Sequence, residues 1–378
     1  LILYNQLIFF VLLVFDNINF LWISLNIIFS ILILIYNPRI SEKFSLLILT
    51  SVFILLSYLF ISSSKITSIL FSVALILTSI VQLNFISNNL KIYNFTKFVK
   101  NTIYFFLIFY IAQLILYKTG ILRLNTFGLS EDMNSIFRFN SLMAEPSYSS
   151  TVMITLLFIN QKLNINKFLI EIIGFIFIVL CQSLFGIILY LIYCSIYHRK
   201  KFKKLFYFEL FSILIIIGFF FTSEYFERIK SLIYFISQNN FDVFELVKVE
   251  PSGAFRILPF ILYIENFELS SLSNYLFGYG SGSSESFLNY ELFKIGYGTS
   301  EFEGSFQGGF LPSFLIDYGF IITLIFLYTI KTTFLLKNDI FQYLILLAIL
   351  LNVNINTQLF WFPLFLFFTT KIYEKNIS

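Results

Sequence analysis

Charged residues are scarce in this chain: only 12% of its 378 residues are Asp, Glu, Lys or Arg, about half the share usual in soluble domains. Histidine occurs once, and the two cysteines, Cys181 and Cys194, both lie in apolar runs. The sequence therefore offers no disulfide framework and no cysteine motif with metal-ligand spacing. The formal charge of +4 is too small to indicate a nucleic-acid partner. An ordinary soluble globule and a disordered chain are both excluded, because 58% of the residues are hydrophobic.

Long apolar stretches dominate the chain instead, and they are rich in aromatic residues, with 53 Phe and 23 Tyr. A helix needs roughly 20 mostly apolar residues to cross a bilayer. Twelve stretches come near this length, and we expect an all-α integral membrane protein that forms one polytopic domain over residues 1–378. The first stretch has no small-residue cleavage site after it, so we expect a retained span rather than a signal peptide. The twelve are Leu1–Phe15, Ile18–Tyr36, Phe44–Ile61, Ile66–Ile86, Ile103–Tyr117, Ser147–Ile159, Phe168–Cys181, Leu184–Tyr197, Leu205–Phe221, Phe310–Ile330, Ile340–Leu351 and Leu359–Thr370.

The basic residues fall mainly in alternate connections between these stretches. One set of connections holds 16 of the 25 Lys and Arg residues, and the other set holds 9, of which 8 lie in two long segments. Short cytoplasmic loops are enriched in Lys and Arg, whereas long segments translocate largely regardless of charge. The pattern predicts about twelve transmembrane helices with both termini in the cytoplasm, as in a multi-pass protein of a bacterial cytoplasmic (inner) membrane.

The two long segments, 118–145 and 222–309, are predicted to be a medium and a large outer (periplasmic) loop. Connections of this length are usually functional, so extramembrane chemistry is expected there. The larger segment has five basic residues against eleven acidic ones. Any anion site in it must therefore depend on individually placed arginines rather than on a basic surface.

The most informative short stretch runs from Arg138 to Ser147 and contains Glu145-Pro146-Ser147. Pro146 disfavours helix at the preceding residue and suits a first helical turn, so Glu145 is expected at a helix N-terminus near the outer membrane boundary. There it either complements the helix dipole or acts as a general base. Arg138 either snorkels to headgroups or binds phosphate oxygens with its guanidinium fork.

An arginine followed by Glu-Pro-Ser at the start of an outer-facing span resembles the O-antigen polymerase and ligase superfamily, and best its Wzy-type polysaccharide polymerase branch. Further segments are similar to motifs of that family in the same order. They are Gln182-Ser183-Leu184-Phe185-Gly186, Ser252-Gly253-Ala254-Phe255-Arg256, Leu276-Phe277-Gly278-Tyr279-Gly280 and Leu315-Ile316-Asp317-Tyr318-Gly319. The ligase branch is expected to carry a histidine in the large outer loop, and no residue of 222–309 is histidine, which favours the polymerase.

The resemblance implies a metal-independent membrane glycosyltransferase that needs no cofactor. It would transfer a glycan from undecaprenyl pyrophosphate onto a new lipid-linked repeat unit, for lipopolysaccharide (O-antigen) or capsule. Its partners would be the lipid-linked oligosaccharide, the bilayer, a chain-length regulator and a flippase, with no nucleic acid. The expected catalytic residues are Glu145, Arg138 and Arg256, and the expected substrate-binding residues are Arg123, Asp317, Ser147 and Tyr279.

Several interpretations stay open at this level. The alternative functions are the O-antigen ligase of the same superfamily and a lipid-linked oligosaccharide flippase or transporter, which predicts charges inside the bundle. Asp317, inside a span, is either functional or faces water at the outer boundary. The histidine, His198, precedes a basic run and is expected to anchor the inner face to anionic headgroups. Glu171 and Glu209 are expected at the membrane interface.

Overall fold

The computed structural model of the chain describes residues 18–60, 66–89, 92–119, 146–165, 167–181, 183–201, 203–220, 251–265, 272–294, 309–336, 339–353 and 358–377. Within these ranges the regular structure is helical, without strands. The helices are α2 (Ile18–Tyr36), the 3-10 turn η1 (Glu42–Phe44), α3 (Ser45–Phe60), α4 (Ile66–Asn89), α5 (Ile92–Lys118), α6 (Pro146–Lys162), α7 (Lys167–Cys181), α8 (Leu184–Lys201), α9 (Lys203–Phe220), α12 (Pro251–Glu265), α13 (Leu272–Phe277), α14 (Ser284–Lys294), α15 (Phe310–Phe334), α16 (Ile340–Asn352) and α17 (Gln358–Ile377).

All the expected spans except Leu1–Phe15, which lies outside the described residues, correspond to helices. The largest differences from the expectation occur at one end of each of two helices. Helix α5 begins at Ile92 rather than Ile103, and α17 continues to Ile377 rather than ending at Thr370. Polar residues such as Lys and Thr do not break a helix, so a helix that leaves the apolar layer continues beyond the stretch that hydropathy identifies.

Three described helices are long and apolar enough to cross a membrane: Ile66–Asn89, Asn94–Gln113 and Phe310–Phe334. Four shorter apolar helices accompany them, at Ile23–Tyr36, Phe168–Cys181, Phe185–Arg199 and Ile340–Asn352. The sides of the bundle also carry large exposed apolar residues, for example Leu70, Ile108 and Leu324. Exposed apolar surface of this extent is typical of contact with lipid. The all-helical class is therefore confirmed, whereas the count of twelve spans stays a prediction.

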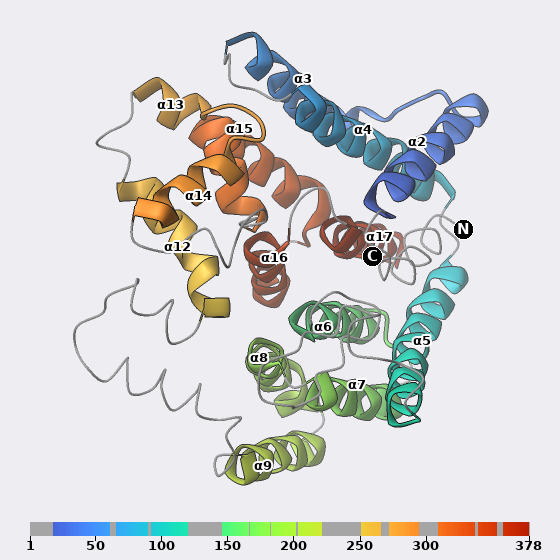
Figure 1. Cartoon of the computed structure of the whole chain (residues 1–378). Helices are drawn as coiled ribbons and strands as arrows, with labels where there is room; N and C mark the ends of the chain where they lie inside the picture. The colour runs from blue at the N-terminus through green and yellow to red at the C-terminus, as the bar shows by residue number, and fades with distance from the viewer. Residues whose placement is uncertain are drawn as a thin grey trace.

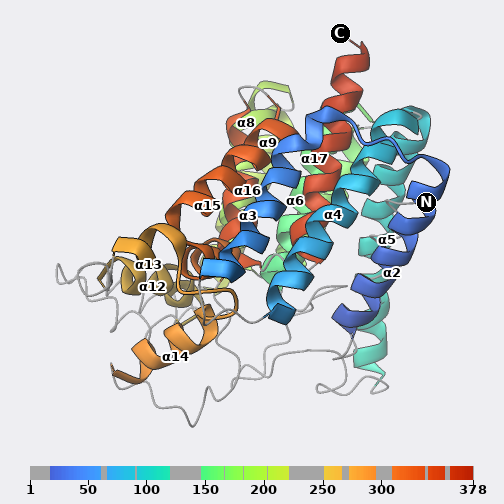
Figure 2. The same cartoon turned by 90° about the horizontal axis from the view of Figure 1, so that it is seen from above.

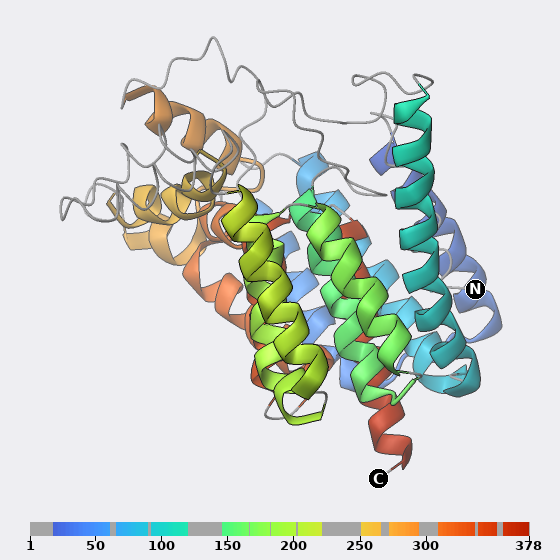
Figure 3. The ribbon, with the colours of Figure 1, turned by 90° about the horizontal axis from the view of Figure 1, so that it is seen from below.

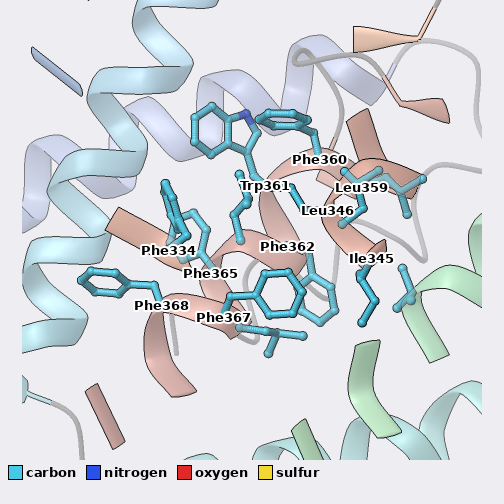
Figure 4. Packing of buried hydrophobic residues seen from close by; sticks show 14 of the residues in the cluster. Phe334, Ile345, Leu346, Leu359, Phe360, Trp361, Phe362, Phe365, Phe367 and Phe368 are labelled. Carbon is cyan, nitrogen blue, oxygen red and sulfur yellow. The ribbon is translucent and has the colours of Figure 1, made fainter. Parts of the chain in front are cut away.

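Helices α6 and α17 form the centre of the bundle (Figure 1). Helix α6 packs against α5, α7, α8, α16 and α17, and α17 also packs against α4 and α15. Ten successive residues of α17, from Leu359 to Phe368, include nine buried apolar side chains, and Figure 4 shows that these point in several directions among residues of α15 and α16 such as Phe334 and Ile345. A helix that is apolar all round is a buried helix.

The buried faces also contain hydroxyl groups, which are satisfied within their own helices. Thr151 and Thr155 of α6 each donate to the carbonyl four residues earlier, at 2.8 Å. Thr369 and Thr370 of α17 do the same, at 2.7 and 2.8 Å. Back-bonding of this kind removes the cost of an unpaired buried hydroxyl, so these polar residues fit an apolar bundle centre.

The bundle has two chemically different ends, as Figures 2 and 3 show. One end holds the C-terminus of α17, the connection from α6 to α7 and the connection from α15 to α16. We call it the basic end, because the sequence assigns these Lys-containing connections to one side. There Lys162 at the end of α6 pairs with Asp339 before α16 at 2.6 Å. Lys371 of α17 donates to the carbonyl of Thr332 at the end of α15, also at 2.6 Å. The basic connections assigned to one side from the sequence are thus gathered in space.

The opposite end carries α12, α13 and α14, and we call it the loop end (Figure 3). Here the start of α6 meets the end of α16, because the Tyr148 hydroxyl donates to the carbonyl of Asn352 at 2.9 Å. The start of α15 joins the same point, since the Phe310 N–H donates to the carbonyl of Val353 at 2.7 Å. Three helix ends therefore converge where the sequence predicts the outer face.

The two ends should lie on opposite sides of the membrane, and cysteine labelling tests this. Ser41 at the basic end and Ser286 at the loop end are exposed, whereas the native Cys181 and Cys194 are buried. In sealed cells we expect a membrane-impermeant thiol reagent to label Ser286→Cys at once, and Ser41→Cys only after permeabilisation. Equal labelling of both in sealed cells would contradict the arrangement; the unsubstituted protein measures the background.

Candidate functional site

The candidate site at the loop end is organised by a break in α15 at Gly319. This residue has φ 74° and ψ 179°, which interrupts the helix between its two apolar halves. Glycine tolerates such a positive φ because it has no Cβ. The break leaves the carbonyls of Ile316 and Asp317 without their usual partners one turn later. In a helix of membrane-spanning length these carbonyls must find other donors.

The donors come from the turn of residues 278–283, which connects α13 to α14. The N–H of Tyr279 donates to the carbonyl of Ile316 at 2.9 Å, and the N–H of Gly280 to that of Asp317 at 3.1 Å. Gly278, with φ 89°, lies directly against Gly319, and a Cβ on either glycine would collide with backbone atoms of the other segment. The two motif segments that the sequence suggested separately, 276–280 and 315–319, are thus in backbone contact.

The Asp317 side chain fastens the same turn to α15. Its two carboxylate oxygens accept from the N–H of Gly282 at 3.0 Å and from that of Ser284 at 2.8 Å, and a longer contact comes from the Ser283 hydroxyl at 3.4 Å. Ser284 opens α14, so Asp317 supplies a charge-assisted cap to the N-terminus of a helix far away in sequence. Asp317 is 9% exposed, and it does not simply face water.

Tyrosine contacts join the neighbouring helices to this turn. The Tyr318 and Ser281 hydroxyls are hydrogen-bonded at 2.8 Å, and both residues are buried. The Tyr279 ring packs on Phe287 of α14 with centroids 5.2 Å apart. Tyr263 of α12 stacks on Tyr275 of α13 at 5.0 Å. The part of segment 222–309 that the structure describes is therefore a set of three helices, α12, α13 and α14, which pack against α15.

The start of α6 shows the helix opening that the Glu-Pro-Ser motif predicts. Helix α6 begins at Pro146, so Glu145 immediately precedes a helix, as expected from the sequence. Ser147 is buried in the first turn and its carbonyl accepts from the Thr151 hydroxyl at 2.8 Å. Tyr148 contacts the end of α16, as described above. Ser147 thus lies at the loop end, inside the bundle rather than on its surface.

The other candidate residues are only partly covered by the structure. Arg123, Arg138 and Glu145 lie outside the described residues. Arg256 is in α12, which packs against α14 and α15, but its side chain lies outside the described part. The structure thus places Asp317 of α15 against the turn that contains Tyr279, puts Ser147 at the same end of the bundle, and leaves the proposed catalytic side chains untested.

Residues 183–186 of the Gln182–Gly186 motif form the start of α8, and Gln182 lies outside the described residues. The Ser183 hydroxyl accepts from the N–H of Gly186 at 3.2 Å, which is the geometry of a helix N-cap. Gly186 lies against Ser150 of α6 so closely that a Cβ there would collide with the Ser150 side chain. This motif therefore has a clear structural role, which is to start α8 and let it approach α6.

A group of buried ionisable side chains lies toward the basic end, and here three sequence-based expectations were wrong. His198, Glu171 and Glu209 are all buried, with at most 1% of their surface exposed. His198 therefore does not anchor to headgroups, and the two glutamates are not interfacial. The His198 ring lies between them, with Nδ1 2.8 Å from Glu209 and Nε2 3.1 Å from Glu171.

The remaining carboxylate oxygens of this cluster are also paired. The Tyr190 hydroxyl donates to Glu209 at 2.8 Å and the Cys194 thiol at 3.3 Å. The Oε2 atom of Glu171 accepts from the Tyr193 hydroxyl at 3.0 Å. Its other oxygen accepts from the amide groups of Asn160 and Gln161 of α6 at 3.1 and 2.8 Å. Four helices, α6 to α9, are thereby connected through one buried polar network.

One feature of the sequence was consistent with this cluster, but it lies in an apolar run and was not recognised. Cys194 and His198 are four residues apart on α8, so they share one helix face. The nearby basic run of residues 199–201 suggested an exposed helix end instead. Glu171 and Glu209 come from other helices, and their approach depends on packing that the sequence does not display.

Comparisons with known proteins do not assign the chain to a family. No family model, no curated protein and no solved structure matches it. Its function therefore has to be inferred from its own motifs and geometry.

Substituting Gly319 should destabilise the loop end. In Gly319→Ala the backbone keeps a positive φ that costs a non-glycine residue about 1–3 kcal/mol, and the new Cβ meets the backbone of Leu276 and Gly278. We expect a lower thermal midpoint for the detergent-purified protein. Leu324→Ala, an exposed position on the same helix, is the control. A Gly319→Ala protein no less stable than this control would contradict the described break.

Substituting Asp317 separates charge from hydrogen bonding in the same turn. Asp317→Ala leaves the N–H groups of Gly282 and Ser284 without an acceptor, and a hydrogen bond to a charged group contributes about 1.5–3 kcal/mol. Asp317→Asn keeps an acceptor oxygen and should lose less. Proteolysis of the folded protein near α14 should therefore be fastest in Asp317→Ala, slower in Asp317→Asn and slowest in the parent. Identical cleavage rates would show that Asp317 does not hold this turn.

Proposed function

We propose that the chain is a polysaccharide polymerase that transfers an undecaprenyl-pyrophosphate-linked glycan onto a new lipid-linked repeat unit. The contact between segments 276–280 and 315–319 is the observation that carries the proposal. Both segments resemble motifs of the Wzy-type polymerases, they are far apart in the sequence, and they pack backbone to backbone through Gly278 and Gly319. An accidental likeness in two short segments would not require them to meet.

The membrane arrangement proposed is twelve spans in a bacterial cytoplasmic membrane, with both termini in the cytoplasm and the loop end outside. Two observations support it. Helices occur at each expected span within the described residues. The C-terminal parts of α6, α15 and α17 lie opposite α12, α13 and α14 (Figure 3), and they are where Lys162 pairs with Asp339 and Lys371 with the Thr332 carbonyl. An isoprenoid-linked substrate requires a site at the membrane boundary, which the loop end would provide.

The proposed chemistry forms a bond between an acceptor hydroxyl oxygen and the anomeric carbon of the donor glycan. The bond from that carbon to the pyrophosphate oxygen breaks, and the pyrophosphate leaves as an anion. Arg138 and Arg256 would stabilise the charge that develops on it, with Arg123 as a further phosphate contact. Glu145 would take the proton of the acceptor hydroxyl. No metal is required for these steps.

The three described candidates would act around this reaction. Asp317 would hold the turn that presents Tyr279, because its carboxylate accepts from the N–H groups of Gly282 and Ser284. Tyr279 offers an aromatic face and a hydroxyl, which suit a sugar ring. Ser147 would fix the start of α6 and thereby the position of Glu145. A flippase and a chain-length regulator would be the functional partners.

A second function, that of a flippase or transporter, is favoured by one observation. Such proteins place charged residues in the bundle interior, and Glu171, His198 and Glu209 form an interior charged cluster. The O-antigen ligase of the same superfamily, the other alternative, gains no support of this kind.

The decisive experiment is a surface-glycan ladder in the organism that encodes the chain. After deletion of the gene, we expect single repeat units to replace the ladder. Wild type and Lys331→Ala, a basic-end control, should restore it. Arg138→Ala, Glu145→Ala and Arg256→Ala should not, because loss of one transition-state contact typically costs about 100–1,000-fold in rate; membrane levels are measured in parallel.

The other outcomes assign the alternatives. Ladders that persist on the lipid carrier but never reach lipopolysaccharide would identify a ligase. Single units confined to the inner leaflet would identify a flippase. An unchanged ladder in the deletion strain would reject all three.

A further inference from the structure

We propose that Cys194, His198 and Glu209 form a zinc site at the junction of α8 and α9. Their ligand atoms, one from each residue, all lie within 4.8 Å of one another, and all three residues are buried. Thiolate, imidazole and carboxylate are the three side-chain donors that zinc uses in proteins. The inference is independent of the proposed polymerase reaction, for which no metal is needed.

The observed spacing is close to that of a filled site. The Glu209 Oε2 atom is 2.8 Å from His198 Nδ1 and 3.3 Å from Cys194 Sγ. Tetrahedral zinc with bonds of about 2.0–2.3 Å sets its ligand atoms roughly 3.3–3.8 Å apart. Small side-chain movements would therefore admit an ion in place of the shared protons. The three side chains supply three donor atoms, because the Oε1 atom of Glu209 accepts from the Tyr190 hydroxyl at 2.8 Å. A water would therefore complete a tetrahedral site.

The surroundings of His198 match those of a metal-bound histidine. A ligating imidazole usually donates its second ring N–H to a carboxylate, which fixes the ring and its tautomer. Here Nδ1 faces Glu209 at 2.8 Å, while Nε2 faces Glu171 at 3.1 Å. Glu171 is itself held by Tyr193 and by the Gln161 amide. A hydrogen-bonding shell that orients the ligands is therefore already in place.

The donor set selects the kind of ion. A thiolate and an imidazole suit zinc and related transition ions, whereas calcium and magnesium prefer oxygen ligands. On binding, the Cys194 thiol and the Nδ1 atom of His198 each lose a proton to solvent, so that a thiolate and a neutral ring nitrogen coordinate the ion while Nε2–H stays on Glu171. The ion enters with charge +2, and the two glutamates and the thiolate stay in contact with it or with its ligand, so no charge remains without a partner.

The position of the site suggests what the ion does. Helix α9 lies at the edge of the bundle (Figure 1) and packs on α8. Cys194 and His198 are on α8 and Glu209 is on α9, so the ion would tie the edge helix to the bundle. Because Glu171 of α7 contacts the His198 ring, α7 is connected to the same site. The site lies toward the basic end, away from the break in α15, so the ion would hold helices together without taking part in the proposed polymerase reaction.

Metal content tests the proposal on the full chain purified in detergent. After exposure to zinc and removal of loosely bound ions, we expect about one zinc per chain by mass spectrometry of the metal. Cys194→Ser should lose it. Cys181→Ser is the matched control, because Cys181 is also buried but lies outside the group, and this variant should keep its zinc. A wild-type protein that retains no zinc would overturn the proposal.

Cobalt provides a test that does not depend on folding of the Cys194 variant. Cobalt bound to a thiolate gives a near-ultraviolet charge-transfer band, and Cys181→Ser leaves Cys194 as the sole cysteine of the chain. We expect the band in wild type and in Cys181→Ser. Its absence from both would overturn the site even if some zinc were retained.

The contact between Glu171 and His198 can be tested in the same way. Glu171→Gln should weaken zinc binding about 10–100-fold, as is usual for loss of the group that orients a ligating histidine, while the cobalt–thiolate band persists. An unchanged zinc affinity in Glu171→Gln would contradict the role assigned to that carboxylate and with it the metal-bound form of His198.

Discussion

The backbone N–H and C=O groups of a helix within a membrane must be hydrogen-bonded inside the protein. Helix α15 breaks its own hydrogen-bond pattern at Gly319. The arrangement of the loop end follows from which groups donate to the carbonyls that this break leaves unpaired. The carbonyls of Ile316 and Asp317 are satisfied by a turn from another part of the chain, and the Asp317 carboxylate then caps the helix that this turn begins. The break, the glycine contact and the cap form one unit, because each would be unfavourable without the others.

The bundle below this unit obeys the same requirement through its side chains. Threonines of α6 and α17 bond within their own helices, and Glu171 of α7, His198 of α8 and Glu209 of α9 are gathered into one network. A buried charge is tolerated when it is paired and hydrogen-bonded, and the contacts of Glu171 and Glu209 fulfil this condition. The two ends of the molecule therefore use different chemistry: backbone pairing at the loop end, and side-chain pairing toward the basic end.

Much of the helix layout was predictable from the sequence, because an apolar run of sufficient length has few alternatives in a bilayer. The start of α6 at Pro146 was predictable for a local reason, namely the fixed φ of proline. The helices of the large outer segment, α12 to α14, were not foreseen, since short helices held by distant contacts leave no strong periodicity. In the candidate site, the sequence identified the motifs around Gly278 and Gly319. It did not predict their contact, because neither segment contains a feature that specifies which other segment it packs against. His198 was misjudged because its neighbours in sequence are basic and its neighbours in space are acidic.

The backbone contact between Gly278 and Gly319 has a consequence for how the length and composition of segment 222–309 can vary. Since the 278–283 turn is fixed to α15 by main-chain atoms, the Asp317 carboxylate and the Tyr318 hydroxyl, these contacts do not involve the chain on either side of α13 and α14. Residues before α13 and after α14 can then be lengthened, shortened or replaced while the turn keeps its place. The same framework can in this way carry outer surfaces of very different composition.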